Sequence, residues 1–289
     1  MGEGWGGGST VTAMTSLPTE PLILDSATKF PPDATGRLCV AASHAGRYAT
    51  WLCARAGLRA VILSDAGIGR EGAGIAGLAD LDAVGMPGAT VSHLTARIGD
   101  GADCLERGAI SHVNETARCL GVTPGITARD AAALLARAPF APRPEPPEIG
   151  EARHALAAHP RAFALDSASL VTPEDAGAIV VTGSHGGLMG GKPELAIKAL
   201  VFAAFFNDAG IGIEEAGTTR LPALDARGIA AATVDAMTAR IGDGRSTHED
   251  GVLSRVNTIA RMLGLREGMS AREAVERLAA ALPSADRTP

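Results

Sequence analysis

Short apolar runs that end in small or polar residues recur along the chain. The runs RLCVAAS and AIVVTGS are typical of strands buried in a sheet that is covered on both faces. We expect six strands of this kind, at residues 37–43, 59–64, 89–94, 178–184, 200–206 and 230–237.

Segments with helical patterns alternate with these runs. We expect helices at residues 48–56, 104–120, 127–138, 151–158, 193–199, 249–263 and 270–282. Thr127 and Ser270 stand at N-cap positions, and Gly121 and Gly264 follow as helix stops. Strands that alternate with helices predict an α/β fold with mainly parallel sheets.

Most of these elements occur twice in the same order. The offset between the matching residues is 141 from Leu24 to Leu165 and 143 after His185. The shared motifs are Leu-Asp-Ser-Ala, Ser-His-x-Gly, Asp-Ala-Gly-Ile-Gly and Thr-Ala-Arg-Ile-Gly-Asp-Gly. We interpret this pattern as a tandem duplication that gives two α/β halves related by a pseudo-twofold axis.

The repeat also divides the chain. We expect a mobile N-terminal segment, a first repeat, a Pro-rich connector with a short helix, a second repeat and a C-terminal tail. These occupy residues 1–21, 22–140, 141–160, 161–283 and 284–289, respectively.

The repeated polar motifs follow the predicted strands, where ligands bind in open parallel sheets. The candidate catalytic residues are His185, Asp208, Glu214 and Lys192. The candidate substrate-binding residues are Ser184, Gly186, Gly187, Gly210, Arg240, Asp243, His44, Asp65, Arg97 and Asp100. The Gly-rich loops and the arginines are suited to holding a carboxylate or a phosphate.

Each of these residue types also has a structural interpretation. A histidine at a strand end either transfers protons or anchors a turn. The aspartates either act in catalysis or bond the N–H groups of their own turns. Arg97 and Arg240 either bind an anion or pair with Asp100 and Asp243. Ser111 and Asn114 are expected on one helix face, where they support the loops, and His93 has no assigned role.

Cofactor signals are weak. The acidic residues would suit Mg²⁺ or Mn²⁺, but no metal signature with fixed spacing occurs. Residues 67–72 fit the pattern G-x-G-x-x-G, yet Glu215 stands at the third glycine of the second half. The acidic Asp82 lies near a helix end instead of a strand end, which argues against a nicotinamide cofactor.

The second half resembles the caspase-like cysteine peptidases in two short motifs. Ser184-His185-Gly186 follows one predicted strand and Asp208-Ala209 follows the next. Gly210 stands at the position of the nucleophilic cysteine, as Gly67 does in the first half. The resemblance therefore implies no peptidase activity.

Composition narrows the function classes. The 289 residues carry a net charge of −6 and only 3% aromatics, which excludes the basic surface and the stacking platforms of nucleic-acid-binding proteins. We expect neither a membrane-spanning segment nor a secretory signal, because no apolar run is long enough to cross a membrane and the N-terminal residues lack the signal pattern. Four cysteines without metal-type spacing indicate free thiols in the cytoplasm. Assembly into a homo-oligomer is compatible with the sequence.

The sequence thus predicts a small-molecule metabolic enzyme, a hydrolase or a lyase/isomerase, that acts on an anionic substrate. A non-catalytic anion-binding or sensory protein with two pseudo-equivalent sites is the alternative. In a third interpretation, the shared motifs only build the halves and join them.

Overall fold

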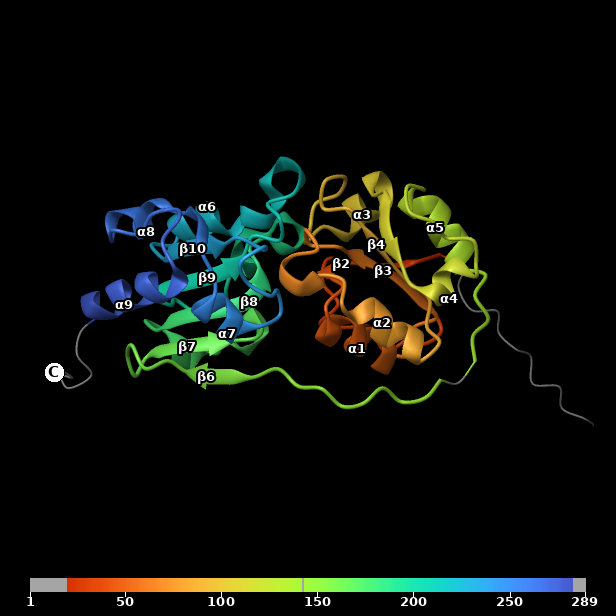
Figure 1. Cartoon of the computed structure of the whole chain (residues 1–289), viewed down its shortest axis with the longest axis horizontal. Helices are drawn as coiled ribbons and strands as arrows, with labels where there is room; N and C mark the ends of the chain where they lie inside the picture. The colour runs from red at the N-terminus through yellow and green to blue at the C-terminus, as the bar shows by residue number, and fades with distance from the viewer. Residues whose placement is uncertain (1–19, 142, 283–289) are drawn as a thin grey trace, which may run out of the picture.

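The computed structural model describes residues 20–141 and 143–282, which form two sheets that lie side by side (Figure 1). The strand order is β1-β2-β3-β4-β5 in the first sheet and β11-β10-β9-β8-β7-β6 in the second. The predictions for residues 1–19 and 284–289 lie outside the described residues.

The first half alternates short strands with helices. Its elements are β1 (Leu22–Leu24), β2 (Leu38–His44), α1 (Arg47–Arg55), β3 (Ala60–Ser64), a 3₁₀ turn (Arg70–Gly72), α2 (Gly77–Ala83), β4 (Gly88–Val91), α3 (Gly101–Arg107), β5 (Ile110–Val113), α4 (Glu115–Arg118) and α5 (Ala128–Leu135). Strands β1 to β4 are parallel, and β5 is antiparallel to β4.

The second half follows the same plan with one additional strand. Its strands are β6 (Arg153–Ala155), β7 (Ala162–Leu165), β8 (Ile179–His185), β9 (Ala203–Asn207), β10 (Ala230–Val234) and β11 (Leu253–Val256). Its α-helices are α6 (Arg220–Asp225), α7 (Gly244–Glu249), α8 (Thr258–Met262) and α9 (Ala271–Ala281). Strands β7 to β10 are parallel, whereas β6 and β11 pair antiparallel at the edges. The predicted α/β class with mainly parallel sheets is confirmed.

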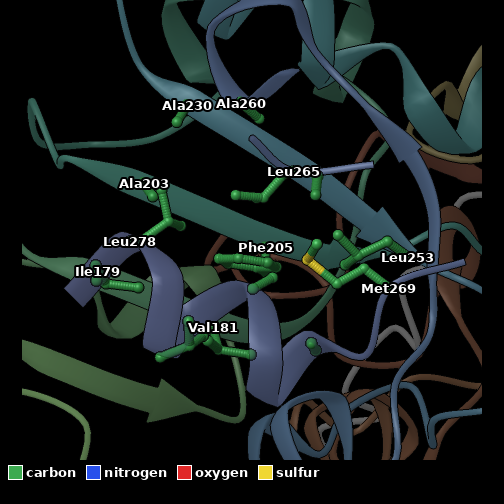
Figure 2. Close-up of a cluster of buried hydrophobic side chains, with 14 of the residues drawn as sticks. Ile179, Val181, Ala203, Phe205, Ala230, Leu253, Ala260, Leu265, Met269 and Leu278 are labelled. Carbon is green, nitrogen blue, oxygen red and sulfur yellow. The ribbon is translucent and has the colours of Figure 1, made fainter. Parts of the chain in front are cut away.

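Both faces of each sheet are buried, which explains why the strands read as continuous apolar runs. Phe205 on β9 packs on one face with Val181, Leu253 and Leu278 (Figure 2). The next residue, Phe206, belongs to the cluster on the opposite face. This alternation gives each sheet two hydrophobic layers and fixes the strand ends that carry the polar motifs.

The two long helices predicted after the third strand of each half are wrong. Residues 104–120 are divided among α3, β5 and α4, and residues 249–263 among α7, β11 and α8. Gly108 lies between α3 and β5, where a Cβ atom would come 2.2 Å from the Cys104 carbonyl oxygen. Ser111 therefore lies on β5, bonded to Thr90, and does not share a helix face with Asn114.

Two smaller predictions also fail. The segment 151–158 contains the edge strand β6 instead of a helix, and residues 193–199 contain only the 3₁₀ turn Pro193–Leu195. The helix starts are confirmed, because the hydroxyls of Thr127 and Ser270 accept hydrogen bonds from Asp130 and Glu273 N–H. Among the helices of residues 20–141 and 143–282, none combines the length and apolar character that a membrane crossing requires.

Candidate functional site

The loops that follow β3 and β9 meet at the junction between the two halves. A Cβ atom at Gly67 would lie 2.8 Å from the Cα atom of Gly210. On either side of this contact, Arg70 N–H donates to the Ala236 carbonyl and Ile213 N–H to the His93 carbonyl, both at 2.8 Å. The structure therefore brings the two Asp-Ala-Gly-Ile-Gly motifs together.

Both loops adopt left-handed backbone conformations that are costly for residues with side chains. Ala66 and Ile68 have φ of 47° and 64°, and Ala209 and Ile211 have φ of 51° and 62°. Strained backbone of this kind persists only where the surroundings impose it, and it is frequent at functional sites. Here, part of the constraint comes from the aspartate that begins each loop.

Asp65 and Asp208 are buried and bind backbone N–H groups. Asp65 Oδ1 accepts from Gly67 N–H at 3.1 Å and from His93 N–H at 2.9 Å. Asp208 Oδ1 accepts from Gly210 N–H at 2.9 Å and from Ala236 N–H at 3.0 Å. These contacts are the turn-bonding role that the sequence left open for the aspartates.

The two aspartates differ in their protonation chemistry. Burial raises the pKa of Asp208 above its ordinary value, although hydrogen bonds from Ser254 and Ala236 oppose the shift. Burial acts on Asp65 too, but the hydrogen bonds from the side chain and backbone of His93 prevail, and its pKa is lowered. The His93 Nδ1 atom lies 2.9 Å from Asp65 Oδ1. No role was assigned to His93 from the sequence, because the matching residue in the second half is Ala236.

The two repeated histidines end β2 and β8 and have the same local geometry. Gly46 N–H donates to His44 Nδ1 at 3.1 Å, and Gly187 N–H donates to His185 Nδ1 at 3.2 Å. An accepting Nδ1 carries no proton, so the neutral rings carry theirs on Nε2. Neither Nε2 atom has a hydrogen-bond partner within the described ranges.

Both imidazoles are neutral at pH 7. Burial lowers the pKa of His44 to about 4. Burial and the charge of Arg220 lower the pKa of His185 well below 6.5. Each ring also reaches the opposite half. A Cβ atom at Gly99 would lie 3.6 Å from His185 Cε1, and one at Gly242 would lie 3.4 Å from His44 Cε1.

The small residues that flank His185 in the Ser-His-x-Gly motif are closely packed. The Ser184 hydroxyl accepts from Ala168 N–H at 2.9 Å. A Cβ atom at Gly186 would come 2.4 Å from the Gly217 carbonyl oxygen, and one at Gly187 would come 2.8 Å from that of Ala216. These positions hold the turn that orients His185.

The arginines of the Arg-Ile-Gly-Asp-Gly motifs pair with carboxylates of both halves. Arg97 contacts Asp100 at 2.9 Å and Glu214, across the junction, at 3.4 Å. Glu214 also accepts from Arg107 at 2.7 Å, and this hydrogen bond lowers its pKa. The guanidinium of Arg97, which was predicted to bind substrate, is thus paired with carboxylates of the protein itself.

The matching contacts in the second half follow the same scheme. Arg240 contacts Asp243 at 3.1 Å and Glu71, across the junction, at 3.3 Å. Asp243 caps α7 by accepting from Ser246 N–H, as Asp100 caps α3 through Asp103 N–H. The aspartates of the motif therefore start helices, and the arginines link the halves.

One charged residue at this junction was missed by the sequence reasoning. Arg220 is only 4% exposed, and its guanidinium lies 4.9 Å from the ring centre of Phe206. Its Nε donates to the Gly187 carbonyl at 3.0 Å and its Nη1 to the Ala196 carbonyl at 2.5 Å. No carboxylate pairs with it among the residues that the structure describes.

Burial lowers the pKa of Arg220 to about 10, so the side chain stays charged at neutral pH. Gly77 occupies the matching position of the first half, and a Cβ atom there would come 2.0 Å from the Thr50 hydroxyl oxygen. The sequence does contain a signal for Arg220: it stands opposite Gly77 in segments of the two halves that otherwise match. Among residues 20–141 and 143–282, a buried cation near the repeated histidine is therefore found in the second half and not in the first.

Lys192, the remaining candidate, is exposed and not joined to this cluster by a hydrogen bond within the described residues. No group of three or more metal-ligating side chains occurs in the described ranges. Two cavities, of about 450 and 310 Å³, lie between the connector and α1, and none of their lining residues belongs to the motif loops.

Comparison with known proteins adds no identity: no family model, no curated protein and no solved structure matches the chain.

Proposed function

We propose that the chain is a small-molecule enzyme, a hydrolase or a lyase/isomerase, that acts on a carboxylate or phosphate substrate beside His185. The observation that carries the proposal is the buried guanidinium of Arg220, which has no carboxylate partner in the described residues. Two backbone carbonyls and the Phe206 ring compensate the charge in part, but a buried charge without a counter-ion remains costly. A substrate anion would supply that compensation.

The state of His185 suits the same substrate. Its neutral ring carries the proton on Nε2, so it can donate a hydrogen bond to an oxygen on which negative charge develops. Asp208, whose pKa is raised, is the better candidate to assist, since Glu214 is already held by Arg107.

We further propose that the halves arose by duplication and are related by a pseudo-twofold axis, with activity retained in the second half. Matching hydrogen bonds at His44 and His185, and at Asp65 and Asp208, support the common origin. The presence of Arg220 opposite Gly77 supports the asymmetry.

A non-catalytic anion-binding protein is the second candidate. The equivalent backbone contacts of His44 and His185 favour it, because they would serve two similar sites equally well. In that case, two anions bind per chain and no compound is consumed.

The experiment compares wild type with Arg220→Met and Arg227→Met. Arg227 is the matched control, because it also donates to main-chain carbonyls of the neighbouring segment, at Ile197 and Ala199. Thermal unfolding is followed with a panel of carboxylate and phosphate metabolites at constant ionic strength. A ligand that binds only the native state raises the midpoint.

We expect panel compounds to stabilise wild type and Arg227→Met but not Arg220→Met. Compounds that bind are then followed by mass spectrometry, where His185→Ala should slow consumption about 100-fold or more, because the hydrogen bond from Nε2 is lost. Equal anion stabilisation of Arg220→Met and wild type would exclude the proposed site. Binding without consumption by wild type would favour the second candidate.

A further inference from the structure

A separate cavity lies on the first half, between the connector and α1. Figure 1 shows the connector passing α1 on its way to β6. Its volume is about 450 Å³, within the range of small-molecule sites. The lining residues are Trp51, Arg55, Glu145, Pro146 and Glu148. One wall is thus helical and the other is extended connector.

The helical wall is an aromatic stripe. Tyr48 and Trp51 stack with their ring centres 5.5 Å apart, and the Arg55 guanidinium lies 5.0 Å from the Trp51 ring centre. These residues are spaced by three and four positions, which places them on one face of α1. Of these three residues, Trp51 and Arg55 line the cavity, so its helical wall carries an aromatic ring and a cation.

Trp51 carries an unsatisfied polar group. Its side chain lines the cavity and the residue is 9% exposed, yet the indole N–H is buried without a hydrogen-bond partner in the described part of the chain. Buried polar groups are nearly always paired, so this donor indicates a missing acceptor.

The connector wall is acidic. Glu145 and Glu148 line the cavity with Arg55, but none of the three takes part in an ion pair within residues 20–141 and 143–282. The cavity thus holds separated charges of both signs, and the tryptophan in its wall has an unpaired N–H donor.

We propose that this cavity binds a small zwitterion of the amino-acid type. The carboxylates of Glu145 and Glu148 receive the ammonium group, and the Arg55 guanidinium and the Trp51 N–H receive the carboxylate. The ligand then bridges the connector and α1. Charge-assisted hydrogen bonds of this kind are the strong ones, and guanidinium groups suit carboxylates geometrically. The inference is independent of the function proposed for His185.

Fluorescence offers a direct test, because Trp5 and Trp51 are the only tryptophans of the chain. In the full-length Trp5→Phe protein, all indole emission comes from Trp51. The twenty free amino acids are titrated one by one to millimolar concentration. The decarboxylated amine and the deaminated acid of each amino acid that binds are then tested in the same way.

We expect at least one amino acid to change Trp51 emission, and both of its truncated analogues to bind at least about tenfold more weakly. Adding Glu145→Gln with Glu148→Gln, or Arg55→Met alone, should weaken binding by about tenfold or more. Glu106→Gln is the matched control, since Glu106 pairs with Arg129 outside the cavity and its loss should leave binding unchanged.

Three results would overturn the proposal. One is the absence of any response to the twenty amino acids. Another is an amine that binds as tightly as its parent amino acid, which would make the site a simple cation site. The third is binding that survives both cavity variants, which would place the ligand elsewhere.

Discussion

The contact between Gly67 and Gly210 predicts a large and local cost for adding a single methyl group. In Gly67→Ala, the new Cβ atom would lie 2.8 Å from Gly210 Cα, 2.9 Å from Gly210 N and 3.1 Å from the Ala209 carbonyl carbon. All three are backbone atoms of the opposite half, so no side chain can rotate to make room.

Two unfavourable terms add at this site. The φ of 72° costs an alanine about 1–2 kcal/mol relative to glycine. Overpacking a filled site costs about 1–3 kcal/mol more. Replacing glycine also lowers the entropy of the unfolded chain, which returns about 0.4–1 kcal/mol. The net loss in unfolding free energy is thus about 1–5 kcal/mol.

Comparison with Gly72→Ala separates the overpacking cost at the Gly67–Gly210 contact from the backbone cost. Gly72 has a φ of 69°, and a Cβ atom there would meet nothing within 4 Å. The backbone and unfolded-state terms are therefore shared by the two variants, and their difference should be the overpacking term of about 1–3 kcal/mol. Urea unfolding of both variants measures that difference. If Gly67→Ala is no less stable than Gly72→Ala, the close approach of the two loops does not exist in solution.

Three further predictions concern single side chains. Asn114 accepts from Gly88 and Ala117 N–H and donates to the Met86 carbonyl, so Asn114→Ala should lower the unfolding free energy by about 2–4 kcal/mol in urea; a loss below about 1 kcal/mol would contradict that network. The pKa of His44 is lowered to about 4 in the folded chain, so as the pH falls the unfolded chain binds this proton first, and the unfolding free energy should decrease from about pH 6.5 to pH 4. His44→Gln should make this decrease smaller. If the urea midpoint of His44→Gln changes with pH as that of wild type does, the assignment is refuted. Arg107 lowers the pKa of Glu214, so the stability from this pair is present above the ordinary pKa of glutamate and is lost as the pH falls. Glu214→Gln should therefore be less stable than wild type at pH 7, but equally stable in strong acid or at high salt. A difference that persists under those conditions would have another origin.

The central strands β2, β3, β4, β8, β9 and β10 could be predicted because burial on both faces leaves a clear signal, whereas the outer strands β1, β5, β6, β7 and β11 were not expected. The runs 37–43 and 178–184 differ from β2 and β8 by one residue at each end. The segments after the third strands could not be predicted, because α3, β5 and α4 contain only seven, four and four residues. Elements this short contain too few residues for either periodicity to stand out from its neighbours.

The site was harder to predict than the sheets. The sequence located the residues that meet at the junction, but it could not decide between chemistry and turn formation for Asp65 and Asp208. That decision depends on backbone N–H groups, which are the same in every sequence. Arg220 was missed because an arginine in a sequence is expected to be exposed. Only the fold shows that it is buried.

The separation of the two sheets has a consequence for assembly. The first half is joined to the second by an extended connector, and the ion pairs of Glu71 and Glu214 cross between the halves. A first half can therefore dock equally well onto the second half of another molecule, which is the geometry of domain exchange. At high protein concentration, such exchanged dimers should accumulate, and cutting the connector should return them to paired fragments with the mass of one chain. Dimers that survive the cut would be held by a different surface.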